Sequence, residues 1–318
     1  MITSTRAFVT VLLAAVFMGA AFSQPPATET GFIQVEPDVR IFYQRFGTGT
    51  PTVFVPMRWE LVSTLAPLLE RFDVVMWDAR GFGLSDRPDD LTRYGLDYEL
   101  ADAEAIRRHF GVERIFYVGG SLWGPTAMLY AARHPESVAG VVAMAPLAIE
   151  ARLMAGPPER PVVSDLSEQI AELEAMKVDG RMDADPYGYC VLDYRIGFAD
   201  SYVDPANFAR LEAANPCQYA NLRDGLPLEV VFEGIIASWG DWNWREEFAA
   251  IEAPVLLLFG DHELWPLEGV RAYGDVLPNV GWFEFLETGH HVWNERTDEV
   301  LAMMEAFFGG AWPTDVHR

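Results

Sequence analysis

Hydrophobic and polar residues follow two alternating patterns along the chain, and the first of them predicts strands. Eight short runs are rich in β-branched and aromatic residues, and the last six are almost continuously apolar. Continuous apolar runs of this length are typical of strands that are buried on both faces of a parallel sheet. The runs are Phe32–Val35, Arg40–Phe46, Thr52–Val55, Val74–Trp77, Arg114–Val118, Gly140–Met144, Val255–Phe259 and Gly281–Leu286.

The second pattern places apolar residues at helical spacing between these runs. It predicts a helix over Tyr98–Phe110, with Gly111 as its C-cap, and further helices over Thr126–Arg133 and Asp298–Phe308. Strands that alternate with helices in this way indicate a doubly wound α/β fold.

The alternation stops over residues 149–243, where no run of the buried-strand type is found. Ser164–Met176 and Pro205–Ala214 have the pattern of amphipathic helices, and aromatic residues are frequent enough to favour packing over disorder. We therefore predict that residues 149–243 form a helical lid, inserted into a core made of residues 24–148 and 244–318.

The N-terminus predicts an exported protein. Ala7–Phe22 is an uncharged run of 16 residues, which is short for a membrane span of about 20 residues. The small residues Ala21 and Ser23 fit the positions before a signal-peptidase cut. We expect residues 1–23 to be a signal peptide that is cleaved near Ser23, which leaves no stable membrane insertion. A retained N-terminal anchor is the alternative.

The composition narrows the class of protein. The 318 residues are 50% hydrophobic and carry 47 acidic against 23 basic side chains, a net charge of −24. Such an acidic surface repels phosphate backbones, so we expect no nucleic-acid partner. Cys190 and Cys217 are too few for a disulfide scaffold or a zinc cluster. In an oxidising compartment they either pair or remain free and buried.

The candidate chemistry begins with the sequence GGSLWG at residues 119–124, directly after a predicted strand. A serine on a strand-to-helix turn projects its hydroxyl beyond the carboxyl edge of the sheet, which favours Ser121 as a nucleophile over an ordinary turn residue. The amide of Leu122, at the start of the helix, can donate to an oxyanion.

Two later segments supply the partners that such a serine needs. Asp261 and Glu263 follow the seventh predicted strand, and His290 follows the eighth. The order serine, acid, histidine is that of a hydrolase triad, in which His290 takes the proton of Ser121 and the acid orients the imidazole.

From about residue 31 to 308 the chain resembles the α/β-hydrolase fold. Residues 78–85 (DARGFGLS) look like the D-x-R-G-x-G-x-S turn of that family, and residues 131–136 (AARHPE) like the end of its nucleophile helix. The GGS-x-x-G motif is similar to that of proline iminopeptidases. The resemblance implies a mainly parallel sheet with a helical cap, and a serine nucleophile without a metal or cofactor.

The resemblance also ranks the candidate residues. The acid of the family lies three residues after the glycine of strand seven, which selects Glu263, with Asp261 as the alternative. Other members carry the acid after strand six, where this chain has Ala145. His291 is a rival base, but the Gly-His pairing of the family selects His290.

One loop departs from the family pattern. The oxyanion loop usually reads H-G-x, whereas here Pro56 is followed by Met57 and Arg58. Pro56 has no amide, so the second oxyanion donor would be the amide of Met57 or Arg58. Trp123 adds bulk beside the nucleophile. An altered oxyanion hole costs roughly 10²-fold in rate, so a weakened enzyme or a non-catalytic binding protein is one alternative.

The sequence thus predicts a secreted or periplasmic serine hydrolase that cleaves an ester or amide bond of a small molecule or short peptide through an acyl-Ser121 intermediate. A proline iminopeptidase-type aminopeptidase is the second alternative. Acidic residues of the lid would then attract a cationic amine, although we favour the interpretation that they form a solvated acidic face. They are Glu168, Glu172, Asp179, Asp183 and Asp185.

Overall fold

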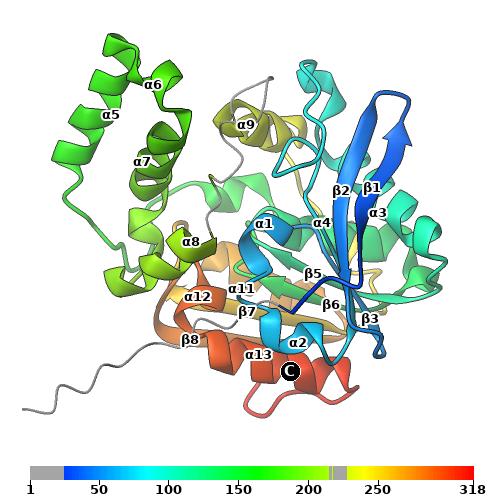
Figure 1. The fold of residues 1–318 in the computed structure, drawn as a ribbon. Helices are drawn as coiled ribbons and strands as arrows, with labels where there is room; N and C mark the ends of the chain where they lie inside the picture. The colour runs from blue at the N-terminus through cyan, green and yellow to red at the C-terminus, as the bar shows by residue number, and fades with distance from the viewer. Residues whose placement is uncertain (1–24, 215–216, 218–227) are drawn as a thin grey trace, which may run out of the picture.

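A computed structural model describes residues 25–214, 217 and 228–318 of the chain. Within them, one eight-stranded sheet has the strand order β1-β2-β4-β3-β5-β6-β7-β8 (Figure 1). β1 is antiparallel to β2, and β2 is antiparallel to β4. The six strands from β4 to β8 in this order, β3 included, run parallel to one another. The bounds are β1 Glu29–Glu36, β2 Val39–Phe46, β3 Thr52–Val55, β4 Asp73–Trp77, β5 Ile115–Gly120, β6 Val138–Met144, β7 Val255–His262 and β8 Val280–Gly289. The predicted signal peptide lies outside the described residues.

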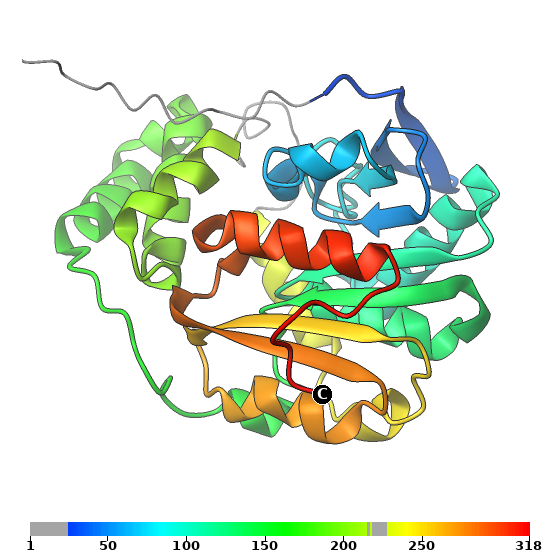
Figure 2. The ribbon, with the colours of Figure 1, turned by 90° about the horizontal axis from the view of Figure 1, so that it is seen from below.

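Helices cover both faces of the sheet. Side chains of α3, α4 and α11 pack with one set of strand residues, while those of α1, α2 and α13 pack with the alternate set. In Figure 2, α2 and α13 lie on the side nearest the viewer. The core helices are α1 Arg58–Leu61, α2 Ala66–Leu69, α3 Leu96–Phe110, α4 Trp123–Arg133, α10 Arg245–Phe248, α11 Glu268–Val276, α12 Val292–Glu295 and α13 Thr297–Phe308. The odd and even positions of each central strand are therefore both buried, as the apolar runs predict.

The eighth predicted strand is less buried than its sequence suggested. β8 is the last strand in the sheet order and pairs only with β7, so it forms an edge. Leu286 remains 66% exposed and Glu284 is half-buried. The expectation that this strand is buried on both faces is wrong, because at this edge of the sheet β8 has no second strand beside it and is bordered only by a backbone bridge between Trp282 and His317.

The segment predicted as a lid contains helices and no strand among its described residues. They are α5 Ser167–Asp179, α6 Arg181–Ala184, α7 Pro186–Phe198, α8 Phe208–Ala214 and α9 Leu228–Ser238. Figure 1 shows α5 to α8 in green beside the sheet. A backbone bridge between Glu150 and Asn243 joins the two ends of the segment at its base. We keep the name lid for residues 149–243.

A disulfide bond links two parts of the lid. Cys190 of α7 is bonded to Cys217, so of the two states left open by the sequence the structure has the paired one.

No helix in the described part of the chain combines the length and the apolar character that are needed to cross a membrane.

Candidate active site

Ser121 occupies a sharp turn between β5 and α4. Its φ angle is +50°, a left-handed conformation that costs a non-glycine residue about 1–3 kcal/mol. The amide of Ser121 donates to the carbonyl of Met144 on β6 at 2.8 Å. Gly119 makes the turn possible, because a Cβ there would lie 2.0 Å from the carbonyl oxygen of Trp123. Ser121 therefore lies on a strained strand-to-helix turn, the position that favours a nucleophile.

His290 and Glu263 come together from the ends of the neighbouring strands β8 and β7. Nδ1 of His290 lies 2.6 Å from Oε2 of Glu263, and the two side chains are 3% and 0% exposed. The other carboxyl oxygen of Glu263 accepts the amide of Gly260 at 3.3 Å. The indole of Trp265 contacts the His290 ring edge-on at 4.7 Å. This buried pair can orient an imidazole and stabilise its protonated form.

Asp261, the alternative acid, has other partners. Its Oδ1 lies 2.7 Å from Nδ1 of His262 and accepts the amide of Thr288 at 3.1 Å, while its Oδ2 binds Arg160 of the lid at 2.5 Å. None of these contacts involves the predicted catalytic histidine. The geometry thus favours Glu263 as the acid, and Asp261 connects the histidine loop to the lid.

The loop after β3 is held by an ion pair instead of by glycine. Met57 is the N-cap of α1 and Arg58 its first residue, so their amides lie at a helix N-terminus. The guanidinium of Arg58 binds Asp78 at 2.6 Å and lies over the ring of Phe42. Met57 packs at the nucleophile turn, since a Cβ on Gly120 would lie 3.2 Å from its sulfur. Both candidate donors therefore belong to an anchored loop beside Ser121.

Leu122 and Trp123 form the start of α4. Leu122 is its N-cap and fully buried, which leaves its amide at the helix N-terminus. The indole of Trp123 is buried, donates to Glu99 at 3.1 Å and contacts the rings of Trp59 and Phe82 edge-on at 5.2 Å. The bulk of Trp123 that the sequence marked as an obstacle is thus accommodated in the core, where it joins the nucleophile turn to the loop after β3.

His291, the rival base, is buried and neutral. Burial lowers the pKa of His291 well below its usual value, and the charge of His290 lowers it further. Its ring stacks on Tyr202 of the lid at 4.8 Å, and its Nδ1 has no hydrogen-bond partner among the described residues. The lid also reaches the histidine loop through its backbone, because a Cβ on Gly289 would lie 2.2 Å from the carbonyl oxygen of Ser201.

Two acidic residues near the site were missed by the sequence reasoning. Glu60 of α1 accepts the indole N–H of Trp293 at 3.0 Å, and burial raises the pKa of Glu60 to about 7 against the lowering effects of Trp293 and His290. Burial, and then the charge of Asp102, raise the pKa of Glu99 to about 8. Their only sequence signal is a glutamate inside an otherwise buried window.

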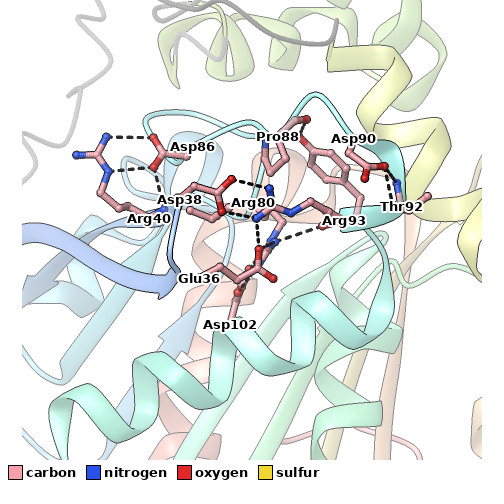
Figure 3. Close-up of polar contacts among 12 residues, drawn as sticks. Glu36, Asp38, Arg40, Arg80, Asp86, Pro88, Asp90, Thr92, Arg93 and Asp102 are labelled. Atoms are coloured by element: carbon pink, nitrogen blue, oxygen red, sulfur yellow. Dashed lines mark hydrogen bonds and ion pairs between the residues drawn. The ribbon is translucent and has the colours of Figure 1, made fainter.

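The D-x-R-G-x-G-x-S turn has a structural role. Arg80 forms two hydrogen bonds with Asp102, at 2.8 and 3.0 Å, and a third with Glu36 at 3.0 Å (Figure 3). Gly83 has a φ of +48°, and a Cβ there would lie 2.1 Å from the carboxyl of Asp78. Because Asp78 also binds the loop after β3, this turn holds the candidate oxyanion loop in place.

Among the described residues, no group of three His, Cys, Asp or Glu side chains is arranged to hold a metal ion.

Comparison with known proteins identifies the class. Residues 55–295 match the family model described as the alpha/beta hydrolase fold, so the chain belongs to this family, and the predicted family and fold class are confirmed.

Individual relatives are distant. A proline iminopeptidase of Lactobacillus helveticus is 22% identical, over 73% of this chain and 78% of its own length. A serine hydrolase of Mus musculus, BPHL, is 28% identical over 57% of this chain and 62% of its own. The crystal structure of the serine hydrolase CCSP0084 from Cycloclasticus zankles superposes with a TM-score of 0.64 at 20% identity, covering 89% of this chain and 98% of that one.

Proposed function

We propose that this alpha/beta hydrolase is a serine hydrolase that cleaves an ester or amide bond through an acyl-Ser121 intermediate. The observation that carries the proposal is the buried contact of 2.6 Å between His290 and Glu263, at the same sheet edge as the strained turn of Ser121. A buried acid and histidine beside a serine with a φ of +50° fit a nucleophile and its base.

The reaction has two halves. His290 accepts the hydroxyl proton of Ser121 as the serine oxygen attacks the substrate carbonyl, and the imidazolium, stabilised by Glu263, then gives that proton to the leaving alcohol or amine. A water molecule then gives a proton to the same histidine as it attacks the acyl group, and the histidine passes this proton to the oxygen of Ser121 as the acid leaves. The negative oxygen of each tetrahedral intermediate accepts hydrogen bonds from the amides of Leu122 and of Met57 or Arg58.

Labelling by a fluorophosphonate tests the nucleophile. The folded wild-type protein should form a covalent adduct at Ser121, whereas Ser121→Ala should not label and should lose hydrolysis of short p-nitrophenyl esters. The alternative of a non-catalytic binding protein gains support if the wild type neither labels nor hydrolyses any of a broad ester panel.

The proline iminopeptidase alternative rests on distant relatives of that name. The lid acids do not strengthen it, because Glu172 and Asp179 are exposed and both pair with Arg181. Parallel assays with proline naphthylamide and short p-nitrophenyl esters separate the two activities. A higher kcat/KM for the naphthylamide would favour the aminopeptidase.

We also propose that the protein is exported and that its leader is cleaved near Ser23. The disulfide between Cys190 and Cys217 supports this, since disulfides persist in oxidising compartments. The mass of the protein recovered from a periplasmic or extracellular fraction tests the cleavage site. A mass that retains residues 1–23 would contradict it.

A further inference from the structure

Glu60 is a nearly buried carboxylate that no lysine or arginine of the described residues contacts. Its side chain is 12% exposed, and its closest basic group is Nε2 of His291 at 3.6 Å. Burial keeps His291 neutral, so this contact supplies no positive charge. Within the described residues, no lysine or arginine nitrogen lies within 4.0 Å of Glu60. The one hydrogen bond to its carboxyl comes from the neutral indole of Trp293.

Aromatic side chains of the lid pack on the histidine that contacts this carboxylate. The ring of His291, next to Glu60, stacks on Tyr202 and contacts Phe198 at 5.2 Å, and Phe198 in turn contacts Tyr194. Burial raises the pKa of the Tyr194 hydroxyl, and the negative charge of Glu60 raises it further. The carboxylate of Glu60 thus lies beside the rings of Trp293 and His291, and the aromatic side chains of the lid pack on His291.

Glu60 is also close to the reacting groups. Its hydrogen-bond donor Trp293 lies with its ring 6.1 Å from that of His290, and a Cβ on Gly120 would approach the Trp293 ring to 3.2 Å. Gly120 directly precedes Ser121. A substrate attached to Ser121 is therefore expected to extend close to Glu60.

We propose that Glu60 and the aromatic rings around it bind a positively charged nitrogen of the substrate, so that the enzyme prefers esters or amides that carry an ammonium or quaternary ammonium group. The inference rests on the proposed hydrolase function and adds the class of substrate. A carboxylate held away from water gains most from a cation, since its interaction with the cation is weakly screened. The faces of aromatic rings attract the same charge.

The preference for a cation follows the ionisation of Glu60. Burial raises the pKa of Glu60 to about 7, so the carboxyl is neutral well below this pH and charged above it. The titratable groups that face it are His290, His291, Tyr194 and Tyr202. His291 is neutral and the tyrosines do not ionise near neutral pH, because burial raises their pKa values first of all. The preference should therefore grow as the pH rises through about 7.

Two matched pairs of substrates test the proposal. Acetylthiocholine and S-(3,3-dimethylbutyl) thioacetate differ only in a charged nitrogen in place of a carbon in the leaving group. The p-nitrophenyl esters of 4-(trimethylammonio)butyrate and 5,5-dimethylhexanoate differ in the same way in the acyl group. The readout is the ratio of kcat/KM for the cationic over the neutral ester, measured from pH 5.5 to 8.5.

For the wild type at pH 8 we expect this ratio to be about 10 or more in at least one pair, and to fall towards one in Glu60→Gln. Glu70→Gln is the control, because it removes one negative charge from an exposed position outside the site and should keep the wild-type ratio. A ratio that is near one in the wild type, or that is the same in wild type and Glu60→Gln, overturns the inference.

A binding measurement separates this outcome from a failure of the proposed function. If the wild type hydrolyses the neutral esters and labels with a fluorophosphonate, a ratio near one refutes only the cation site. If it does neither, calorimetric titration with choline at pH 8 still tests the site: wild type and Glu70→Gln should bind, and Glu60→Gln should bind at least about 10-fold more weakly. Equal affinities in all three proteins overturn the inference.

Discussion

The contact between His290 and Glu263 yields the sharpest prediction for catalysis. In the proposed reaction the imidazole becomes positively charged with a carboxylate oxygen 2.6 Å from its Nδ1, and both side chains are at most 3% exposed. With the charge centres about 4 Å apart and an effective dielectric constant of about 20, the attraction is about 4 kcal/mol. Glu263→Gln keeps the volume and removes this charge, so kcat should fall by about 10³-fold.

Asp261→Asn is the matched comparison. Asp261 is as buried as Glu263 and lies two residues away, but its partners are His262, Thr288 and Arg160. We expect this variant to lose less than about 10-fold in kcat, with a larger effect on thermal stability, since it weakens the hydrogen bonds of a buried carboxylate to Thr288 and Arg160.

The assay is steady-state hydrolysis of a short p-nitrophenyl ester, with circular dichroism melting as the control for folding. If Asp261→Asn loses more activity than Glu263→Gln while both remain folded, the assignment of the acid is wrong.

Three further predictions concern stability and the candidate oxyanion loop. Because burial raises the pKa of Glu99 in the folded protein to about 8, folded Glu99 holds its proton more tightly than unfolded Glu99, and stability decreases as the pH rises from about 4.5 to 8. Glu99→Gln should therefore raise the melting temperature at pH 9 and have little effect at pH 5; the same shift at both would contradict the role of ionisation. Asp78→Asn leaves the buried guanidinium of Arg58 without its charge partner, which should cost about 3–5 kcal/mol in urea unfolding and lower kcat by at least about 10-fold; wild-type kcat in the folded variant would show that the loop needs no such anchor. Replacing Cys190 and Cys217 together by serine opens a link across 27 residues and should cost about 3 kcal/mol in the same unfolding assay, and an unchanged midpoint would show that the lid does not unfold with the core.

The sequence predicted most of the elements because their signals are local. β3 has the predicted bounds Thr52–Val55, and α3 ends at Phe110 with Gly111 in the left-handed conformation of a C-cap. The burial of β8 was mispredicted, because whether a strand lies at an edge depends on sheet order, which an apolar run does not encode.

The candidate site divides in the same way. Ser121, Glu263 and His290 carry motif signals, since each follows a strand end at a recognisable spacing. Glu60 and Glu99 carry none. Burial raises their pKa values, and it comes from packing with distant segments: Glu60 accepts a hydrogen bond from Trp293 and Glu99 from Trp123, which are 233 and 24 residues away. Contacts of this kind are fixed by packing, and so are the burial and the pKa values that follow from them.

The contact between Ser201 and Gly289 affects how the lid can change over evolution. The carbonyl of Ser201 occupies the space that a side chain at position 289 would need, and Tyr202 stacks on His291. The lid and the loop that carries His290 are therefore shaped to each other. A lid taken from another hydrolase would have to bring its own histidine loop, so substrate range in this protein is expected to evolve through side-chain changes within the lid more readily than through exchange of the lid as a whole.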